Sequence, residues 1–404
     1  MRQSFSAEAL NRVTFLVGDS DIVGGMRGLP ALRLFDDRIT AFLDDVSKRL
    51  LANRASREYS DVVTFAFWIR RASVRKLASR FPTNEGELRF GRGMLFHIAP
   101  SNVPVNFAYS AVAGLLCGNA NVVRVPSKDF PQVEIIVRAI REALDAHEGM
   151  RPYLSLVRYG RERDINDALS SIASVRVVWG GDATIQELRQ SPLPPRSTEV
   201  TFADRWSIAV IDSDAYLALE DKGRVAQDFY NDTFFSDQNA CTSPRIVVWT
   251  GSSIEEAKRQ FWAEEHALVR SRYELQPVQA VNKLTSADLA AVAFPGCRVE
   301  SREDNLIVRI YVPEAKASLM ELRDNSGYFY EYDCEDILDL RDLCNDVQCQ
   351  TLGYLGNKDD LLPLFQSGVR GVDRVVPIGK TMDFDLIWDG YDLVAALTRT
   401  MAIS

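Results

Sequence analysis

Three short motifs in this chain contain residue types that could perform chemistry on a carbonyl group. The first, FSDQNACTSPR at 235–245, surrounds Cys241 with small and amide side chains. A thiolate attacks carbonyl carbon, but an ordinary thiol, with a pKa of about 8.5, needs backbone N–H groups or a cation such as Arg245 to ionise. A lone cysteine is also commonly an inert packing group, so the loop alone leaves both interpretations open.

The second and third motifs each follow a short apolar run. In PSNVP, Pro100 and Pro104 bracket Asn102, whose amide could donate to a developing oxyanion. A rigid turn in which Asn102 caps the next helix is the alternative. In VWGGD, Gly180 and Gly181 allow a backbone to approach a phosphate or a nicotinamide closely, although a tight turn explains them equally well.

Strands and helices alternate around these motifs. Apolar runs predict buried strands, and small or amphipathic segments predict the helices between them. The strands are expected at 94–100, 119–127, 154–160 and 174–181, and the helices at 106–118, 131–147 and 165–173. This alternation is typical of a doubly wound parallel sheet, which binds ligands at the carboxyl ends of its strands.

Further elements precede and follow this run. The spacing of apolar residues predicts amphipathic helices at 33–54 and 62–81. A second α/β run over about 208–375 predicts a second domain, with strands at 206–214 and 245–251 and helices at 215–235 and 253–273. The last residues, 396–404, alternate like an edge strand.

Composition restricts the class of protein. A chain of 404 residues is expected to form two domains, and a net charge of −9 argues against broad electrostatic binding of nucleic acid or anionic membrane. We find no membrane-length apolar run and no secretory signal at the start, which predicts a cytoplasmic protein with six reduced cysteines. Three scattered histidines and the C-x4-C pair Cys344 and Cys349 make a metal site improbable.

Together the motifs resemble the aldehyde dehydrogenase superfamily, and more closely its LuxC-type acyl-CoA reductase (fatty acid reductase) branch. FHIAPSNVPVNFAYSAVAGLLCGNANVVRVPSKD resembles that branch's cofactor-domain signature, and FSDQNACTSPRIVVW resembles its nucleophile loop. VRVVWGGDATI, FADRWSIAVID and QTLGYLG are similar too, so the resemblance covers most of 30–400. It implies an α/β fold: a Rossmann-type NAD(P)-binding domain at 1–207 with a return at about 376–404, a catalytic domain at 208–375, and a C-terminal edge strand for oligomerisation.

The resemblance also implies roles for individual residues. Cys241 falls on the catalytic cysteine, which forms a thioester with the acyl group. Asn102 falls on the oxyanion-hole asparagine, with the Cys241 backbone N–H as the second donor. The residues expected to bind the cofactor are Pro100, Ser101, Arg124, Ser127, Lys128, Gly180 and Gly181.

Two departures from aldehyde-oxidising relatives are informative. Where those enzymes have K-P-S-E, this chain has V-P-S-K, and Lys128 would attract the 2′-phosphate that a glutamate repels, which favours NADPH over NADH. Where they have a water-activating glutamate, this chain has Thr201, and Glu199, two residues away and on the same face of the strand, is left open as a substitute. We therefore expect hydrolysis of the thioester to be suppressed, so that hydride transfer releases an aldehyde.

The predicted function is NADPH-dependent reduction of an activated acyl group, most simply a fatty acyl-CoA, to the aldehyde. Three alternatives stay open: an acyl-phosphate or acyl-carrier reductase, an NAD(P)-dependent aldehyde dehydrogenase, and a non-enzymatic acyl-binding scaffold. The expected partners are a second copy of the chain, in a homodimer or higher oligomer, and an acyl-activating synthetase. His97 is expected in the core, and Trp388 and Asp389 either shape the acyl or nicotinamide pocket or form a packed turn.

Overall fold

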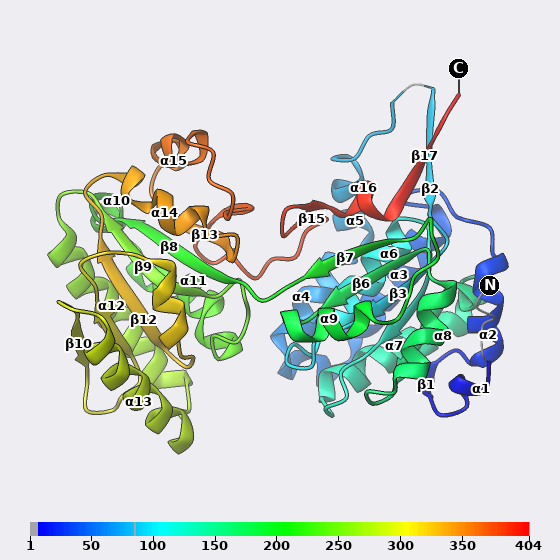
Figure 1. The fold of residues 1–404 in the computed structure, drawn as a ribbon, viewed down its shortest axis with the longest axis horizontal. Coiled ribbons are helices and arrows are strands. Elements are labelled where there is room, and N and C mark those ends of the chain that lie inside the picture. The colour runs from blue at the N-terminus through cyan, green and yellow to red at the C-terminus, as the bar shows by residue number, and fades with distance from the viewer. Residues whose placement is uncertain (1–6, 85, 404) are drawn as a thin grey trace. The chain divides into compact units, whose positions relative to one another are not determined.

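The computed structural model describes residues 7–84 and 86–403, and contacts divide the chain into two compact units (Figure 1). Unit 1 contains Met1–Ala203 and Tyr391–Ser404, and unit 2 contains Asp204–Gly390. The sequence placed these boundaries near residues 207 and 376. Strand β14 (Arg374–Pro377) pairs with β13 (Cys349–Leu355) in the sheet of unit 2, which keeps this segment in the second unit.

Unit 1 is built on a six-stranded sheet in the order β1-β5-β4-β3-β6-β7. All neighbours are parallel except β1 and β5. The strands are β1 (Thr14–Val17), β3 (Met94–Ile98), β4 (Ala120–Arg124), β5 (Leu154–Arg158), β6 (Val175–Trp179) and β7 (Thr198–Phe202). The helices are α1 (Ala7–Leu10), α2 (Ser20–Gly25), α3 (Asp37–Ala52), α4 (Ser60–Trp68), α5 (Arg71–Ala78), α6 (Asn106–Leu116), α7 (Pro131–Ala146), α8 (Arg163–Ile172), α9 (Asp182–Arg189) and α16 (Leu393–Leu397).

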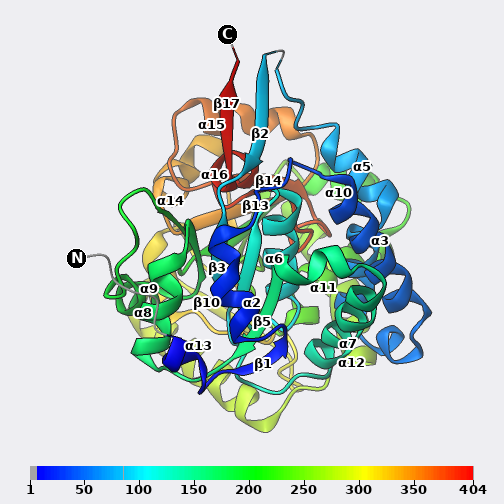
Figure 2. The same cartoon turned by 90° about the vertical axis from the view of Figure 1, so that its right-hand side faces the viewer.

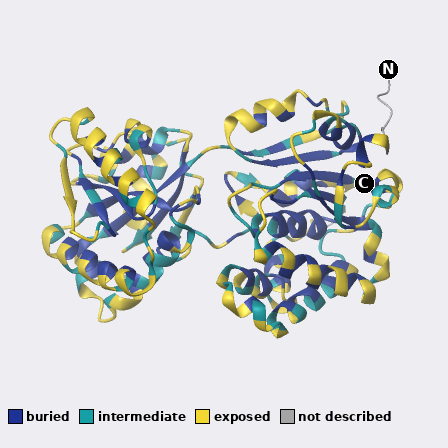
Figure 3. Cartoon of the chain, turned by 90° about the horizontal axis from the view of Figure 1, so that it is seen from below, coloured by how far each residue is buried: buried dark blue, intermediate teal, exposed yellow. Residues whose placement is uncertain are grey.

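The central strands of unit 1 are covered on both faces. Every residue of β3 and of β6 is buried, and their runs MLFHI and VRVVW lack the alternation of a half-exposed strand. Figure 3 shows the strands in dark blue between helices whose outer surfaces are exposed. Parallel sheets require this double cover because the crossover helices lie on their faces.

The predicted helix at 33–54 is present as α3, which buries Ile39, Phe42, Val46 and Leu50 on one face. The prediction of one helix over 62–81 was wrong, because the chain forms α4 and α5 with a break at Arg70. A carboxylate from α3 explains the break: Asp44 accepts a 3.0 Å hydrogen bond from the backbone N–H of Arg71 and so caps the new helix. A cap supplied by another helix leaves no local signal in the sequence.

The C-terminal segment forms strand β17 (Thr398–Ala402), which pairs antiparallel with β2 (Glu87–Gly91). The pair forms a ribbon that projects from unit 1 (Figure 2). The predicted strand at the end of the chain is therefore present, and its part in oligomerisation stays a prediction.

Unit 2 is built on a seven-stranded sheet in the order β10-β11-β12-β9-β8-β13-β14, parallel except at β10. Besides β13 and β14, its strands are β8 (Trp206–Asp212), β9 (Pro244–Thr250), β10 (Arg298–Ser301), β11 (Val308–Tyr311) and β12 (Tyr328–Asp333). Its helices are α10 (Ser213–Ala218), α11 (Lys222–Asp232), α12 (Ile254–Arg272), α13 (Pro277–Ala293), α14 (Arg341–Asn345) and α15 (Leu362–Gln366). The short strands β15 (Ile387–Trp388) and β16 (Tyr391–Asp392) follow.

Alternate residues of the central strands of unit 2 enter two separate cores. Ile208 and Val210 of β8 join one core with α13, whereas Ala209 and Ile211 join the other with Phe229 of α11 and with α12. The helix predicted at 215–235 is two helices, since the Asp221 carboxylate accepts from the Arg224 backbone N–H and starts α11 afresh. Among the described residues, no helix is long and apolar enough to cross a membrane.

Candidate active site

Cys241 lies at the tip of a tight turn at the amino end of strand β9. The backbone N–H of Ser243 bonds to the carbonyl of Ala240 at 3.1 Å, which places Cys241 at the first central position of the turn. Cys241 is exposed, whereas its neighbours Ala240 and Thr242 are buried. Four of the other cysteines, Cys117, Cys334, Cys344 and Cys349, are buried, so the turn presents this thiol selectively.

The segment before the cysteine is held in an unusual backbone conformation. Asp237 and Gln238 have φ angles of 55° and 57°, a left-handed region that costs free energy for residues other than glycine. The fully buried Gln238 amide compensates with four hydrogen bonds: it donates to the carbonyls of Pro244 and Tyr328 and accepts from the N–H groups of Gly327 and Tyr328, at 2.9–3.1 Å. The nucleophile loop is therefore fixed to both β9 and β12.

Charged groups of unit 2 act on the Cys241 thiol. Desolvation, the largest cause, and the Asp389 carboxylate together raise the pKa of Cys241 to about 11, against the opposing effect of Arg205. Although the residue is exposed, dense surrounding protein therefore disfavours the thiolate. The raised pKa favours the thiol over the thiolate.

The sequence suggested Arg245 as the cation that lowers the pKa of the Cys241 thiol. In the structure, Arg205 has the larger effect on this pKa. Arg245 is buried and donates to the Gln238 carbonyl at 2.5 Å and to the Asn325 side chain at 2.6 Å, besides the Asp324 carbonyl. Its guanidinium is thus used to hold the loop. Arg205, the residue before β8, is the cation that most lowers the pKa of the thiol.

The PSNVP motif follows β3 in unit 1. Ser101 and Asn102 are exposed in a bend, and Pro100 and Pro104 are half-buried. Helix α6 begins four residues after Asn102, at Asn106, so the Asn102 side chain does not cap it. The alternative of a helix cap is wrong, and the Asn102 amide is free to donate to a ligand.

The two glycines follow β6, the strand next to β3. From β3 the chain first adds β4 and β5 on one side of the sheet and then β6 and β7 on the other side. The strand order therefore reverses between β3 and β6, which is the position where open α/β sheets bind dinucleotides. Helix α9 begins at Asp182, immediately after Gly181. A Cβ built on Gly181 meets no atom within 4 Å, so the space beside this backbone is open to a ligand.

The residues after β4 lie at the same carboxyl edge of the sheet. Ser127 and Lys128 are exposed, and the Lys128 ammonium lies 5.2 Å from the centre of the Phe130 ring. Arg124 is committed elsewhere, because its guanidinium donates to the Gly160 carbonyl and stacks 4.7 Å from the Tyr159 ring. Lys128 is therefore the better placed of the two predicted cations to meet a ligand.

His97 is buried in the core of unit 1, as expected. Its Nε2 lies 2.9 Å from Asn121 Oδ1 and its Nδ1 lies 2.7 Å from Ser110 Oγ, which also accepts from Trp179 at 3.0 Å. The Asn121 amide nitrogen donates to the Asn119 carbonyl, so its oxygen must accept from His97 Nε2–H. Burial lowers the pKa of His97 to about 4, so the imidazole is neutral at physiological pH and supports Trp179 before the two glycines.

Glu199, considered as a substitute base, is bound by two arginines. Its carboxylate accepts from Arg176 at 2.5 and 2.8 Å and from Arg189 at 2.8 Å. Arg176 is itself buried, which makes the ion pair a structural tie between β6 and β7. Thr201 lies two residues further along β7 and carries no carboxylate.

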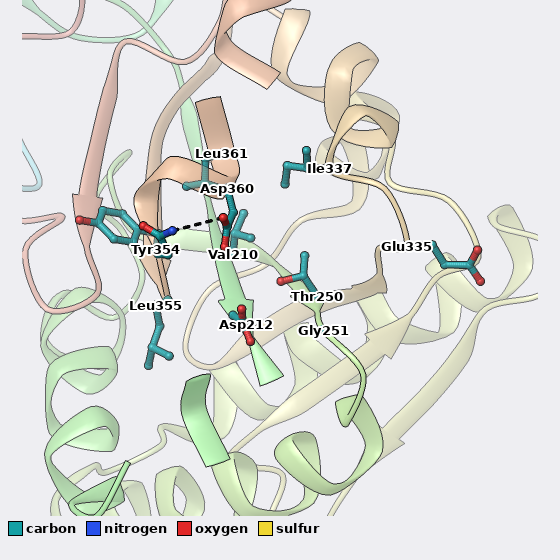
Figure 4. Close-up of a pocket in the computed structure, with 12 residues that line it drawn as sticks. Val210, Asp212, Thr250, Gly251, Glu335, Ile337, Tyr354, Leu355, Asp360 and Leu361 are labelled. Carbon is teal, nitrogen blue, oxygen red and sulfur yellow. Dashed lines mark hydrogen bonds between the residues drawn. The ribbon is translucent and has the colours of Figure 1, made fainter. Parts of the chain in front are cut away.

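A separate cavity of about 240 Å³ lies at the carboxyl ends of β8, β9 and β13 (Figure 4). Asp212 and Thr250, at the ends of β8 and β9, line it, but the Asp212 carboxylate is engaged in capping α10 through the N–H groups of Asp214 and Ala215. Cys241 lies at the amino end of β9, so a seven-residue strand of roughly 20 Å separates it from this cavity. The cavity is therefore not the site of Cys241 chemistry.

The structure thus gathers the predicted residues into two groups. Pro100, Ser101, Asn102, Ser127, Lys128, Gly180 and Gly181 lie at one edge of the sheet of unit 1, and Cys241 lies in unit 2. Sequence reasoning missed Gln238 and Arg205. Only the polarity of SDQNAC and the charge before the apolar run WSIAVI hinted at these two residues. Among the described residues, no cluster of His, Cys, Asp or Glu is arranged to hold a metal ion.

Comparison with known proteins gives consistent results. A family model described as acyl-CoA reductase (LuxC) matches residues 69–401. The long-chain acyl-protein thioester reductase of Photorhabdus luminescens is 27% identical over 180 residues, which cover 44% of this chain and 36% of the relative. That of Vibrio harveyi is 24% identical over 305 residues, which cover 73% of this chain and 60% of the relative. The matches thus span less than two thirds of these relatives.

Among solved structures, the P. syringae indole-3-acetaldehyde dehydrogenase AldA, in complex with NAD+, superposes with a TM-score of 0.65. Its sequence is 12% identical, and the match covers 98% of this chain and 87% of that chain. The likeness confirms the predicted aldehyde dehydrogenase-like α/β fold.

Proposed function

This chain belongs to the LuxC acyl-CoA reductase family, and we propose that it reduces a long-chain acyl thioester to the aldehyde through a thioester on Cys241. The related long-chain acyl-protein thioester reductases support a thioester substrate. Acyl-CoA and an acyl-protein carry the acyl group on the same chemical linkage. The reacting thioester carbonyl is therefore the same in both substrates. The two differ only in how the carrier binds to the protein.

The exposed position of Cys241, on a turn anchored by the buried Gln238, is the observation that carries the proposal. An inert packing thiol would be buried, and a scaffold would not need two consecutive left-handed residues to present one. Attack of the Cys241 sulfur on the acyl carbonyl expels the carrier thiol. The Asn102 amide and the Cys241 backbone N–H stabilise the negatively charged oxygen in this step.

The cofactor is proposed to be NADPH, held at the carboxyl edge of the unit 1 sheet. Pro100, Ser101, Gly180 and Gly181 flank the position between β3 and β6 that suits a dinucleotide. Exposed Lys128, with Ser127, is suited to the 2′-phosphate, whereas Arg124 contributes less because it already binds Gly160. The bound nicotinamide supplies the hydride that reduces the thioester carbonyl.

Release of aldehyde rather than acid requires that water does not reach the thioester. Thr201 is a poor base, and Glu199 is neutralised by Arg176 and Arg189. Neither side chain is suited to activating water, which favours reduction over hydrolysis. The aldehyde dehydrogenase alternative is disfavoured for the same reason.

Assembly is proposed to use strand β17. In the described residues β17 pairs with β2 on one side only, so its other edge can add a strand from a second copy. A homodimer or higher oligomer, a cytoplasmic location and a synthetase that supplies the activated acyl group complete the proposal.

Intact mass spectrometry tests this function directly. Wild type and Cys241→Ala are mixed with a series of acyl-CoAs without cofactor, and NADPH is then added. We expect an acyl adduct on the wild type alone, which NADPH removes with release of aldehyde. An adduct lost equally fast without NADPH would indicate hydrolysis, and absence of an adduct with CoA esters, acyl carriers and acyl phosphates alike would overturn the proposal.

A further inference from the structure

Helix α5 and the residue before it present positive charge in an acidic chain. Four basic side chains are exposed there: Arg70, Arg71, Arg75 and Lys76. No acidic residue occurs between positions 62 and 84, although the chain as a whole carries a net charge of −9. These four side chains form what we call the α5 basic surface, which is opposite in sign to the protein as a whole.

Among the described residues, one carboxylate pairs with this surface. Arg71 lies 3.7 Å from the Asp44 carboxylate of α3, but Lys48 pairs with the same carboxylate at 2.8 Å. The Arg71 and Lys48 side chains remain 51% and 72% exposed. Within the part of the chain that the structure describes, the side chains of Arg75 and Lys76 form no hydrogen bond or ion pair. The excess positive charge is therefore open to a partner outside the chain.

The residues around these cations suit an interface with another protein. Ala72 is exposed and lies three positions before Arg75 and four before Lys76, so this small side chain shares their face of the helix. Beside this face, the Phe67 ring is 46% exposed, and the Arg70 guanidinium lies 5.4 Å from its centre. Arginine and aromatic residues are enriched where proteins bind one another.

Helix α4 connects the α5 basic surface to the proposed cofactor edge of unit 1. Near the start of α4, Asp61 accepts a 3.3 Å hydrogen bond from Gln132 in the first turn of α7. At the end of α4, the Trp68 ring lies 5.2 Å from the Tyr109 ring in the first turn of α6. Helices α6 and α7 begin at the carboxyl edge of the sheet, which also carries Asn102. The basic surface starts two residues after Trp68, so it lies beside this edge.

The shape of the surface favours a protein over CoA as the bound group. A small ligand binds in a concave pocket, whereas the exposed side of a helix is convex. The four cations extend over about 9 Å of chain at the helical rise, so they can meet several carboxylates of another surface at once. The related reductases are named for an acyl-protein thioester, in which a protein carries the acyl group. Charge and shape together indicate an acidic protein.

We propose that the α5 basic surface binds an acidic acyl carrier protein that delivers the acyl thioester. The inference rests on the proposed function and chooses the protein-bound acyl group from the carriers which that function leaves open. As the bond from the Cys241 sulfur to the acyl carbon forms, the bond from that carbon to the carrier sulfur breaks. The carrier leaves as a free thiol with the proton of Cys241, and nothing is oxidised. Complementary charge speeds the encounter of the two proteins, and salt screens it.

Charge reversal on α5 tests this surface. In Arg75→Glu/Lys76→Glu, single-turnover acylation of Cys241 by a long-chain acyl carrier protein should become about tenfold slower or more. Acylation by the acyl-CoA of the same chain length should stay within about twofold, because CoA does not need the surface. Intact mass without cofactor measures both rates. In the wild type, raising NaCl from about 50 to 500 mM should slow the carrier reaction, and the variant should lose this dependence.

Arg138→Glu/Arg196→Glu is the matched control, because both arginines are exposed in unit 1 and the change adds the same negative charge. We expect the control to react with the carrier within about threefold of the wild-type rate. Equal slowing in the control and in R75E/K76E would mean a general effect of charge and would overturn the proposal. Equal slowing with the carrier and with acyl-CoA, or a wild-type carrier rate in R75E/K76E, would overturn it as well.

Binding without chemistry separates this inference from the proposed function. In a Cys241→Ala background, the Kd of the acyl carrier protein, measured by fluorescence anisotropy, should rise about tenfold or more when R75E and K76E are added. An unchanged Kd would overturn the binding surface even if Cys241 is acylated, whereas a wild type that binds the carrier but accepts no thioester would overturn the proposed function alone. Loss of binding to phosphatidylserine vesicles with no effect on the carrier would assign the surface to a membrane instead.

A neutral variant covers the case in which R75E/K76E does not fold. Arg75→Gln/Lys76→Gln removes the two charges without adding carboxylates, and both side chains are exposed, so the melting temperature should stay near that of the wild type. We expect the carrier reaction to slow several-fold and the acyl-CoA reaction to stay unchanged. Wild-type rates with both substrates would overturn the proposal.

Discussion

The Ser207 hydroxyl donates a 2.7 Å hydrogen bond to the backbone carbonyl of Cys241. Ser207 lies in β8 and is fully buried, and its oxygen also accepts from the Thr351 backbone N–H at 3.3 Å. One hydroxyl therefore connects the nucleophile turn with two neighbouring strands, β8 and β13. The Ser207 hydroxyl therefore fixes the backbone of Cys241, while Cys241 itself remains exposed.

Replacing Ser207 by alanine should loosen this turn. We expect a loss of about 1 kcal/mol in the free energy of unfolding, since the Cys241 carbonyl and the Thr351 N–H lose this partner. Acylation of Cys241 should slow several-fold, measured by intact mass over time. Ser236→Ala is a suitable control, because that hydroxyl contacts Ser243 rather than the cysteine. An unchanged acylation rate in S207A would contradict this role.

Gln238 should matter more for stability than any other residue of the loop. In Gln238→Leu, four backbone groups at β9 and β12 lose their partners inside the protein, which we expect to cost about 2–4 kcal/mol in urea unfolding. Asn239→Ala, the exposed neighbour, should cost less than about 1 kcal/mol. Equal costs for the two variants would argue against the anchoring role of Gln238.

Charge reversal at Lys128 tests the choice of cofactor. In Lys128→Glu we expect the KM for NADPH to rise at least tenfold and the KM for NADH to change little, because a carboxylate repels only the extra phosphate. Lys76→Glu, on α5, is the control for a general change of charge. Parallel changes in both KM values would show that Lys128 does not read the 2′-phosphate.

Gly181→Ala separates a folding role from a ligand role. The added Cβ meets no protein atom within 4 Å, so the melting temperature should stay within a few degrees of the wild type. Cofactor affinity, measured by fluorescence titration, should fall at least tenfold if the ligand backbone or phosphate approaches this glycine. Wild-type affinity in G181A would place the cofactor elsewhere.

Asp232 should make stability depend on pH. Desolvation raises the pKa of Asp232 to about 7, against which the N–H groups of Gly379 and Thr381 act. The folded state therefore holds a proton that the unfolded state releases above about pH 4, so this contribution to stability is lost as the pH rises from about 4 to 7. In Asp232→Asn the loss should be absent.

The difference between D232N and wild type measures that contribution. We expect the unfolding free energy of D232N minus that of the wild type to increase by up to about 4 kcal/mol between pH 4 and 7. Above pH 7 this difference should stay constant. Urea unfolding at pH 5, 6, 7 and 8 provides the comparison. A constant difference across this range would mean that Asp232 keeps its ordinary pKa when folded.

The sequence by itself predicted most of the strands and helices and indicated the candidate chemistry-bearing residues. Uninterrupted apolar runs such as MLFHI and VRVVW predicted buried parallel strands, because only strands covered on both faces read this way. The small residues around Cys241 and the prolines around Asn102 singled out both side chains. Periodicity and turn chemistry act over a few residues, so a sequence displays them directly.

Tertiary structure alone decided what surrounds these residues. Asp44 divides the predicted helix at 62–81 from a position 27 residues away, and Glu199 is occupied by Arg176 and Arg189 instead of being free as a base. Arg205 pairs with Asp389 although 184 residues separate them. Desolvation and pairing of charges depend on distances through space, which the order of residues along a chain does not contain.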